Sequence, residues 1–256
     1  MESRTIAATA IFTAFVAAVT MAFAIYIPAT KGYFDIGEIM VYVVAILMGP
    51  YIGAFAGGVG SAISDAILAP QYAPGTLVIK GLEGLIVGYL TNMRLFELTR
   101  RRWLAISASL AAVVSFLVSY LGVYYLSGAQ QLYLGFSSGP TTAIGPQFSA
   151  SFNVPWELWP VVGGITFVGI VYAGLKLDAR LGWTILAILL GGSEMVAGYF
   201  LFESIGLQLG FVTAGVEVPI NAGQVLVGLI VAIPVVRSYR RMMRRSPKTG
   251  QVRANS

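Results

Sequence analysis

The chain has 256 residues, of which 57% are hydrophobic and only 11% charged, whereas a typical soluble domain has about 25% charged residues. Such a composition cannot cover a water-exposed surface, so the sequence predicts an integral membrane protein. Histidine and cysteine are absent, which excludes disulfides, imidazole metal ligands and Ser-His or Cys-His catalytic pairs.

Eight stretches are apolar over much of the roughly 20 residues that a helix needs to cross a bilayer. Turn-forming residues separate them, most clearly at Pro28 and at Gly49-Pro50. The sequence therefore predicts an all-α integral membrane protein with about eight transmembrane helices. The expected spans are 6–27, 36–48, 51–68, 76–93, 103–126, 156–175, 181–202 and 221–236.

The net charge of +5 is explained by topology, because Lys and Arg favour the cytoplasmic ends of membrane helices. With a cytoplasmic N-terminus, every Lys and Arg except Lys31 and Lys80 falls at a cytoplasmic end or in the C-terminal region. We therefore expect a multi-pass plasma-membrane protein with both termini in the cytoplasm. The basic tail, 247–256, is expected to contact anionic lipid and not nucleic acid.

Polar residues gather at the outer ends of the spans. An ionisable group at membrane depth costs several kcal/mol and normally faces a protein interior or a wet cavity. Because the span 36–48 is only about 20 Å long, its outer end should lie below the outer surface. The sequence thus predicts an outward-facing polar pocket formed by Tyr33, Asp35, Glu38, Asp65, Lys80, Glu83, Glu194, Asn221 and Gln224.

Glu194 is the deepest of these acids, and Lys80 is its expected ion-pair partner. The alternative is that such a pair is a structural link between two helices. Charges at helix ends, such as Asp65, Glu83 and Glu217, could equally cap a helix or anchor it at the interface.

Small residues recur every four positions in the first span, at Ala10, Ala14 and Ala18. This spacing places them in one row, along which another helix can approach closely. The residues alone leave open whether the row packs inside the bundle or contacts a partner.

Several sequence blocks resemble the S components of energy-coupling factor (ECF) vitamin transporters, in particular the riboflavin-type group. The likeness covers about 4–95 and 182–240. The blocks are Gly32-Tyr33-Phe34-Asp35-Ile36-Gly37-Glu38, Gly49-Pro50, 57–61 with Asp65, 73–84, 195–200, and 217–221 with Gln224.

The resemblance implies a substrate-binding subunit that captures a vitamin or vitamin precursor from outside, beneath the loop between its first two helices. It implies no enzymatic activity and no bound cofactor. Such a subunit docks, through the row Ala10, Ala14 and Ala18, onto a transmembrane coupling subunit with two ATPase subunits. ATP is then used only by partner subunits, in keeping with the lack of a GxxxxGK[ST] motif in this chain.

S components look like six-helix proteins, so the segment 103–175 is expected to be an inserted helix pair within one transmembrane domain, 1–246. The core helices would lie in 4–95 and 181–240. The long loop 127–155 is either a lid over the pocket or an exterior segment without fixed structure.

The main alternative is a self-sufficient secondary transporter or channel that uses Glu194 and Lys80 as a proton relay. A membrane enzyme is less well supported, because no nucleophile-base pair or metal-ligand cluster is present. An acid-rich pocket with two amides, near Tyr33, Tyr72 and Trp156, suits a neutral or cationic heteroaromatic ligand. Riboflavin, a pyrimidine vitamin precursor and thiamin all fit this description.

Overall fold

The computed structural model describes residues 3–92, 99–125, 127–134 and 148–245. Among these residues, seven helices are long and apolar enough to cross a membrane, and α2 (Glu38–Met48) is a shorter apolar helix. The prediction of an all-α integral membrane protein is therefore confirmed.

The chain divides into two compact units, whereas the sequence predicts a single transmembrane domain, 1–246. One unit contains Met1–Leu95 and Trp183–Ser256, and the other contains Phe96–Gly182. The predicted inserted pair, 103–175, lies entirely within the second unit.

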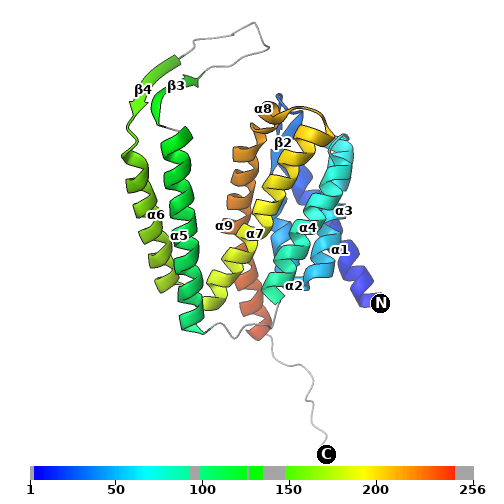
Figure 1. The fold of residues 1–256 in the computed structure, drawn as a ribbon. Helices are drawn as coiled ribbons and strands as arrows, with labels where there is room; N and C mark the ends of the chain where they lie inside the picture. Colours follow the sequence, from blue (N-terminus) through cyan, green and yellow to red (C-terminus); the bar gives the residue numbers. More distant parts are fainter. Residues whose placement is uncertain (1–2, 93–98, 126, 135–147, 246–256) are drawn as a thin grey trace, which may run out of the picture. The chain divides into compact units, whose positions relative to one another are not determined.

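The first unit is a helical bundle in which short elements connect the long helices (Figure 1). Its helices are α1 (Ser3–Ala22), α2, α3 (Pro50–Leu68), α4 (Ala73–Asn92), most of α7 (Ala179–Leu201) and α9 (Glu217–Arg245). A hairpin of β1 (Ala24–Ile27) and β2 (Gly32–Asp35) joins α1 to α2. A π-helical turn, Phe202–Gly206, and the short α8 (Phe211–Ala214) join α7 to α9.

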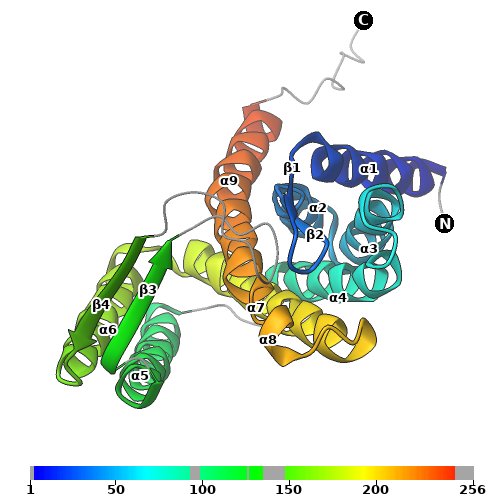
Figure 2. The same ribbon diagram turned by 90° about the horizontal axis from the view of Figure 1, so that it is seen from above.

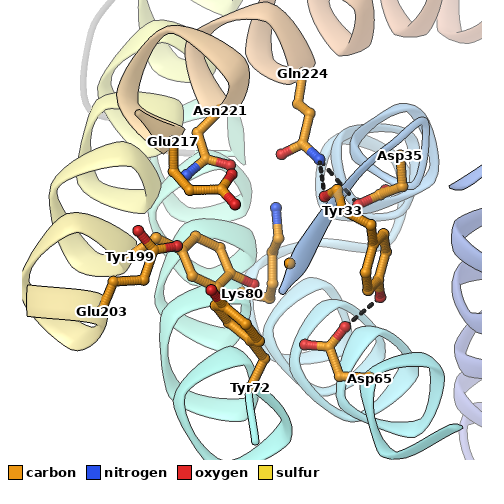
Figure 3. A pocket seen from close by; sticks show the side chains of 11 residues that line it. Tyr33, Asp35, Asp65, Tyr72, Lys80, Tyr199, Glu203, Glu217, Asn221 and Gln224 are labelled. Atoms are coloured by element: carbon orange, nitrogen blue, oxygen red, sulfur yellow. Dashed lines mark hydrogen bonds between the residues drawn. The ribbon is translucent and has the colours of Figure 1, made fainter. Parts of the chain in front are cut away.

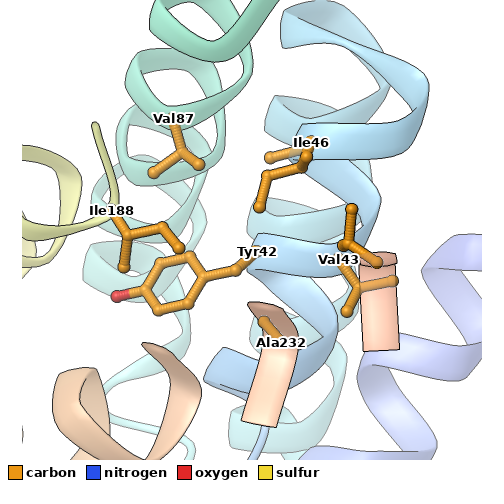
Figure 4. Close-up of a cluster of buried hydrophobic side chains, with 8 residues drawn as sticks. Tyr42, Val43, Ile46, Val87, Ile188 and Ala232 are labelled. Carbon is orange, nitrogen blue, oxygen red and sulfur yellow. The ribbon is translucent and has the colours of Figure 1, made fainter. Parts of the chain in front are cut away.

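The central helix of this unit is α2, which contacts α1, α3, α4 and α9. Tyr42 and Ile46 on α2 are fully or almost fully buried. They pack against Val87 of α4, Ile188 of α7 and Ala232 of α9 (Figure 4). Because α2 has 11 residues, it extends only about 17 Å and cannot span the bilayer.

Glycines bring α3 and α4 into backbone contact. A Cβ atom on Gly58 would lie 2.6 Å from the carbonyl oxygen of Leu77, and one on Gly88 would lie 2.6 Å from the Pro50 Cα. A Cβ on Gly84 would overlap the backbone of Gly53. We call this contact the glycine seam (Gly53, Gly58, Gly84 and Gly88). Larger residues would force the two helices apart.

The β1–β2 hairpin corrects the predicted first span. The span was expected to continue to Ile27, but α1 ends at Ala22, and Ala24–Ile27 pair antiparallel with Gly32–Asp35. The β-branched and aromatic side chains of this stretch suit a strand. Seen from above, the hairpin lies over α2 within the first unit (Figure 2).

The last helix is longer than predicted at both ends. The expected span, 221–236, lies inside α9, which runs from Glu217 to Arg245. The end of α9 is therefore a basic helical extension, where Arg240 donates a hydrogen bond to the Ile46 carbonyl at 3.3 Å. The predicted tail, 247–256, lies outside the described residues.

The second unit consists of α5 (Arg100–Tyr125), α6 (Leu158–Lys176) and a hairpin of β3 (Gly128–Leu134) and β4 (Phe148–Val154). Ser115 and Trp103 on α5 donate hydrogen bonds to the carbonyls of Gly163 and Gly174 on α6, at 2.7 and 2.9 Å. The predicted loop, 127–155, thus contains paired strands, and its part 135–147 lies outside the described residues. Its role as a lid stays a prediction.

Candidate functional site

A polar pocket lies beneath the β1–β2 hairpin, where the ends of α3, α4, α7 and α9 meet in the first unit (Figure 3). Its volume is about 40 Å³, which is room for a few water molecules. Ligand sites usually have about 300 Å³ or more, so in this conformation the pocket is too small for an organic ligand of ordinary size. It is lined by Gly32, Tyr33, Asp35, Asp65, Tyr72, Lys80, Tyr199, Glu203, Glu217, Asn221 and Gln224.

Hydrogen bonds hold strand β2 over the pocket from two sides. The Tyr33 hydroxyl donates to the Asp65 carboxylate of α3. The Gln224 amide of α9 donates to the Asp35 carboxylate at 3.0 Å. The pocket cannot open on this side unless these bonds break.

The turn of the hairpin is bound to the opposite part of the site. The Thr30 hydroxyl donates to the Glu217 carboxylate at the start of α9, and the Tyr72 hydroxyl donates to the Thr30 carbonyl at 3.0 Å. Lys31 has a positive φ of 61°, which the tight turn after β1 requires. Three separate elements therefore fix the position of the hairpin.

Asp65 connects three helices at the side of the pocket. Besides Tyr33, it accepts a hydrogen bond from the Thr76 hydroxyl of α4. The oxygen atoms of Thr76 and Tyr199 lie 2.9 Å apart, which extends the network to α7. Burial and the Asp65 carboxylate raise the pKa of the Tyr33 phenol, so Tyr33 keeps its proton and remains a donor.

Lys80 forms ion pairs with Glu38 and Glu83, and the prediction that it pairs with Glu194 is wrong. Its Nζ lies 3.3 Å from the Glu83 Oε2, and the Tyr42 hydroxyl donates to Glu83 at 2.8 Å. Lys80 and Glu83 are three residues apart on α4, so the helix itself brings them together. Glu38, in the first turn of α2, completes the pairing.

The structure brings together six of the nine predicted site residues at the pocket. These are Tyr33, Asp35, Asp65, Lys80, Asn221 and Gln224. Glu38 and Glu83 contact Lys80 but do not line the pocket, and the partly buried Glu194 lies outside it. Binding of a substrate by these residues stays a prediction.

Two lining side chains, those of Tyr199 and Glu203, escaped the sequence analysis. Glu203 lies one residue beyond the predicted end of a span, so the criterion of acids at outer helix ends would have found it. Tyr199 lies four residues earlier, on the same helix face. Tyr72 and Glu217, considered from the sequence but not assigned to the site, also line the pocket. Trp156 belongs to the second unit.

The predicted alanine row lies on an exposed face of α1. Ala10, Ala14 and Ala18 are exposed, whereas Val16 and Ala17 on the same helix are buried. Internal packing therefore does not account for the row in the described part of the chain. Docking of a partner on this face stays a prediction.

Burial raises the pKa of Asp35 from 3.8 to about 6, although Lys80, the Gly37 amide and Gln224 favour its charged form and Glu83 opposes it. Folded protein then binds more protons than unfolded protein between about pH 4 and 6, so stability falls as the pH rises through this range. We expect melting temperatures in detergent to decrease from pH 4 to 6. Replacement of Asp35 by Asn should flatten this part of the profile, and superimposable profiles would contradict the assignment.

The acids of the site do not converge on one point. Among the described residues, no group of three or more acidic side chains has an arrangement that could hold a metal ion. What the arrangement offers is a ring of acceptors, tyrosines and amides around a small volume. This chemistry suits recognition of a small organic molecule.

In the described part of the chain, seven helices of spanning length and a short central helix define a multi-pass membrane protein. A small polar pocket lies near one end of the helices of its first unit. Residues 1–151 match the family described as ECF-type riboflavin transporter, S component. This is more than half of the chain, and the chain belongs to this family. The family is one of transporter components and not of enzymes.

The matched range differs from the expected one. It continues through α5 and ends within β4, so it includes part of the segment that we interpreted as an insertion. It does not reach the later blocks at 195–200 and 217–221.

The chain is also similar to a Pyrococcus woesei protein described as "Uncharacterized protein in gap 3'region". The two are 55% identical over 73 residues, which is 28% of this chain and 49% of that protein. The match thus spans about half the length of this relative.

Proposed function

We propose that the chain is the substrate-binding subunit of an ECF-type importer, which captures a vitamin or vitamin precursor from outside the cell. The observation that carries this proposal is the polar pocket beneath the β1–β2 hairpin. Its polar lining lies at the helix ends that the distribution of Lys and Arg assigns to the outside. In this proposal the protein lies in the plasma membrane with cytoplasmic termini.

Capture requires the pocket to enlarge. A volume of about 40 Å³ is several times smaller than a site for a vitamin. The ligand would enter when the hairpin releases Asp65 and Glu217, and its own polar groups would replace the donors from Tyr33 and Thr30. Because of this exchange, Asp65 and Glu217 would accept hydrogen bonds both without and with the ligand.

Transport would come from partners. We propose that α1 docks through Ala10, Ala14 and Ala18 onto a transmembrane coupling subunit, and that two ATPase subunits use the ATP. The exposed row of small side chains supports this, because it permits close helix contact in lipid. The alternative of a Glu194–Lys80 relay in a self-sufficient transporter has lost its support, since Lys80 pairs with Glu38 and Glu83.

The test separates capture from transport. A small molecule that copurifies with the chain is identified by mass spectrometry and radiolabelled. We expect proteoliposomes containing the chain alone to bind this molecule but not to accumulate it. Proteoliposomes that also contain the coupling and ATPase subunits should accumulate it when ATP is enclosed on the ATPase side. Accumulation by the chain alone would contradict the proposal.

A further inference from the structure

The four carboxylates that line the pocket are bound only by neutral donors. In the described part of the chain, no ion pair reaches Asp35, Asp65, Glu203 or Glu217. The donors are the Gly37 amide and Gln224 for Asp35, Tyr33 and Thr76 for Asp65, and Thr30 for Glu217. Neutral donors leave the formal negative charge of these groups in place.

Glu203 is the least satisfied of the four. Glu203 is 1% exposed, and its Oε2 atom is buried without a hydrogen-bond partner. A buried carboxylate oxygen in this state is costly, and native proteins seldom leave one unpaired. Glu203 lies in the π-helical turn after α7, a kind of turn that is frequent at functional sites. Its position in the pocket lining indicates a partner supplied by the ligand.

The cation that lines the pocket is already neutralised. Lys80 pairs with Glu38 and Glu83, whose side chains are 1% and 0% exposed and do not line the pocket. Its amino group lies between Glu217 and Asn221 on one side and Tyr33 and Asp35 on the other (Figure 3). One ammonium group therefore faces several carboxyl groups, and acidic side chains outnumber basic ones in the lining.

The shape and the aromatic content of the lining favour an organic cation over a metal ion. The acids are distributed around the pocket, and the described residues contain no three-acid metal arrangement. Tyr33, Tyr72 and Tyr199 also line it, and tyrosine rings attract organic cations. Lys80 Nζ, at 5.6 Å from the centroid of the Tyr199 ring, already makes such a contact.

We propose that the ligand of this pocket is an organic cation, whose positively charged nitrogen binds between Glu203, Glu217 and the tyrosine rings. Neutral riboflavin, named in the family's description, would provide no positive charge to pair with these four acids. This inference rests on the proposed function, because it takes the pocket to be the substrate site. The competing explanation is that the four lining acids are protonated, so that no ligand charge is needed.

The experiment uses the full chain in detergent at pH 7.5 with probes of known charge. The cations are thiamin and 1-methylnicotinamide, and the neutral probes are riboflavin and nicotinamide. Nicotinamide is the matched control for 1-methylnicotinamide, because it has the same ring and amide without the positive charge. We expect at least one cation to raise the melting temperature and to give a Kd by calorimetry, and neither neutral probe to bind. Glu203→Gln and Glu217→Gln should each weaken the cation by about tenfold or more.

The glutamine variants keep the size of the side chain, and their melting temperatures without probe report whether they fold. The exposed Glu157 in the second unit supplies a matched control, and Glu157→Gln should bind the cation as the parent does. Binding of riboflavin or nicotinamide, or no binding of either cation, would overturn the inference. Riboflavin binding would leave the proposed function intact, whereas accumulation by the chain alone would overturn that function and not the ligand class.

Discussion

Replacement of Lys80 by Met is expected to lower the free energy of unfolding by about 3–5 kcal/mol, the usual cost of removing one partner from a buried ion pair. Among the described residues, Lys80 is the cation that pairs with Glu38 and Glu83. All three side chains are buried. Methionine fills a similar volume but leaves two carboxylates without a counter-charge. Thermal melting in detergent and SDS titration measure the change.

The design separates ion pairing from packing. Glu38→Gln combined with Lys80→Met removes one of the uncompensated charges, so the double variant should recover part of the lost stability. Glu194→Gln is the matched control, since Glu194 has no ion pair with Lys80 and should change the melting temperature much less. If Lys80→Met melts like the parent, the buried ion pairs do not stabilise the fold.

Replacement of Ala14 by Leu is expected to reduce uptake in cells to the background level while ligand binding by the purified chain is unchanged. Ala14 lies in the middle of the exposed row on α1, so the larger side chain would hold an approaching helix away. The same side chain meets only lipid or detergent in the isolated chain. Uptake of labelled ligand and copurification of the coupling subunit measure docking.

The matched control is Ala66→Leu, because Ala66 is an exposed alanine on α3 outside the row. It should leave both uptake and copurification unchanged. Normal uptake by Ala14→Leu would show that this face is not the docking surface. Equal loss in both variants would point to a general effect of added bulk.

Apolar length was sufficient to predict the helices, because few other structures can satisfy backbone groups in a membrane. It could not separate the end of α1 from β1. The segment 24–27 is as apolar as the helix before it, and hydrophobicity alone does not distinguish a buried strand from a helix. The deciding contact is the pairing with Gly32–Asp35, which depends on the tertiary structure.

The candidate site was partly predictable for a similar reason. Polar residues at the outer helix ends indicated a common pocket, and six of the nine predicted residues line it. The partners of Lys80 were harder to predict. Glu83 can be predicted as a partner because it is a neighbour on the same helix. The pairing with Glu38 depends on how α2 is rotated and shifted against α4. Sequence spacing carries no information on that register.

The glycine seam has a consequence for how the pocket can change size. Since the backbones of α3 and α4 touch, these helices form a stationary wall that carries Asp65 and Lys80. The adjustable wall consists of the hairpin, the π-helical turn and the start of α9, with Asp35, Glu203 and Glu217. Ligands of different length would therefore all contact the same stationary wall, formed by α3 and α4. Selection for a new ligand could alter the adjustable wall while α3 and α4 stay unchanged.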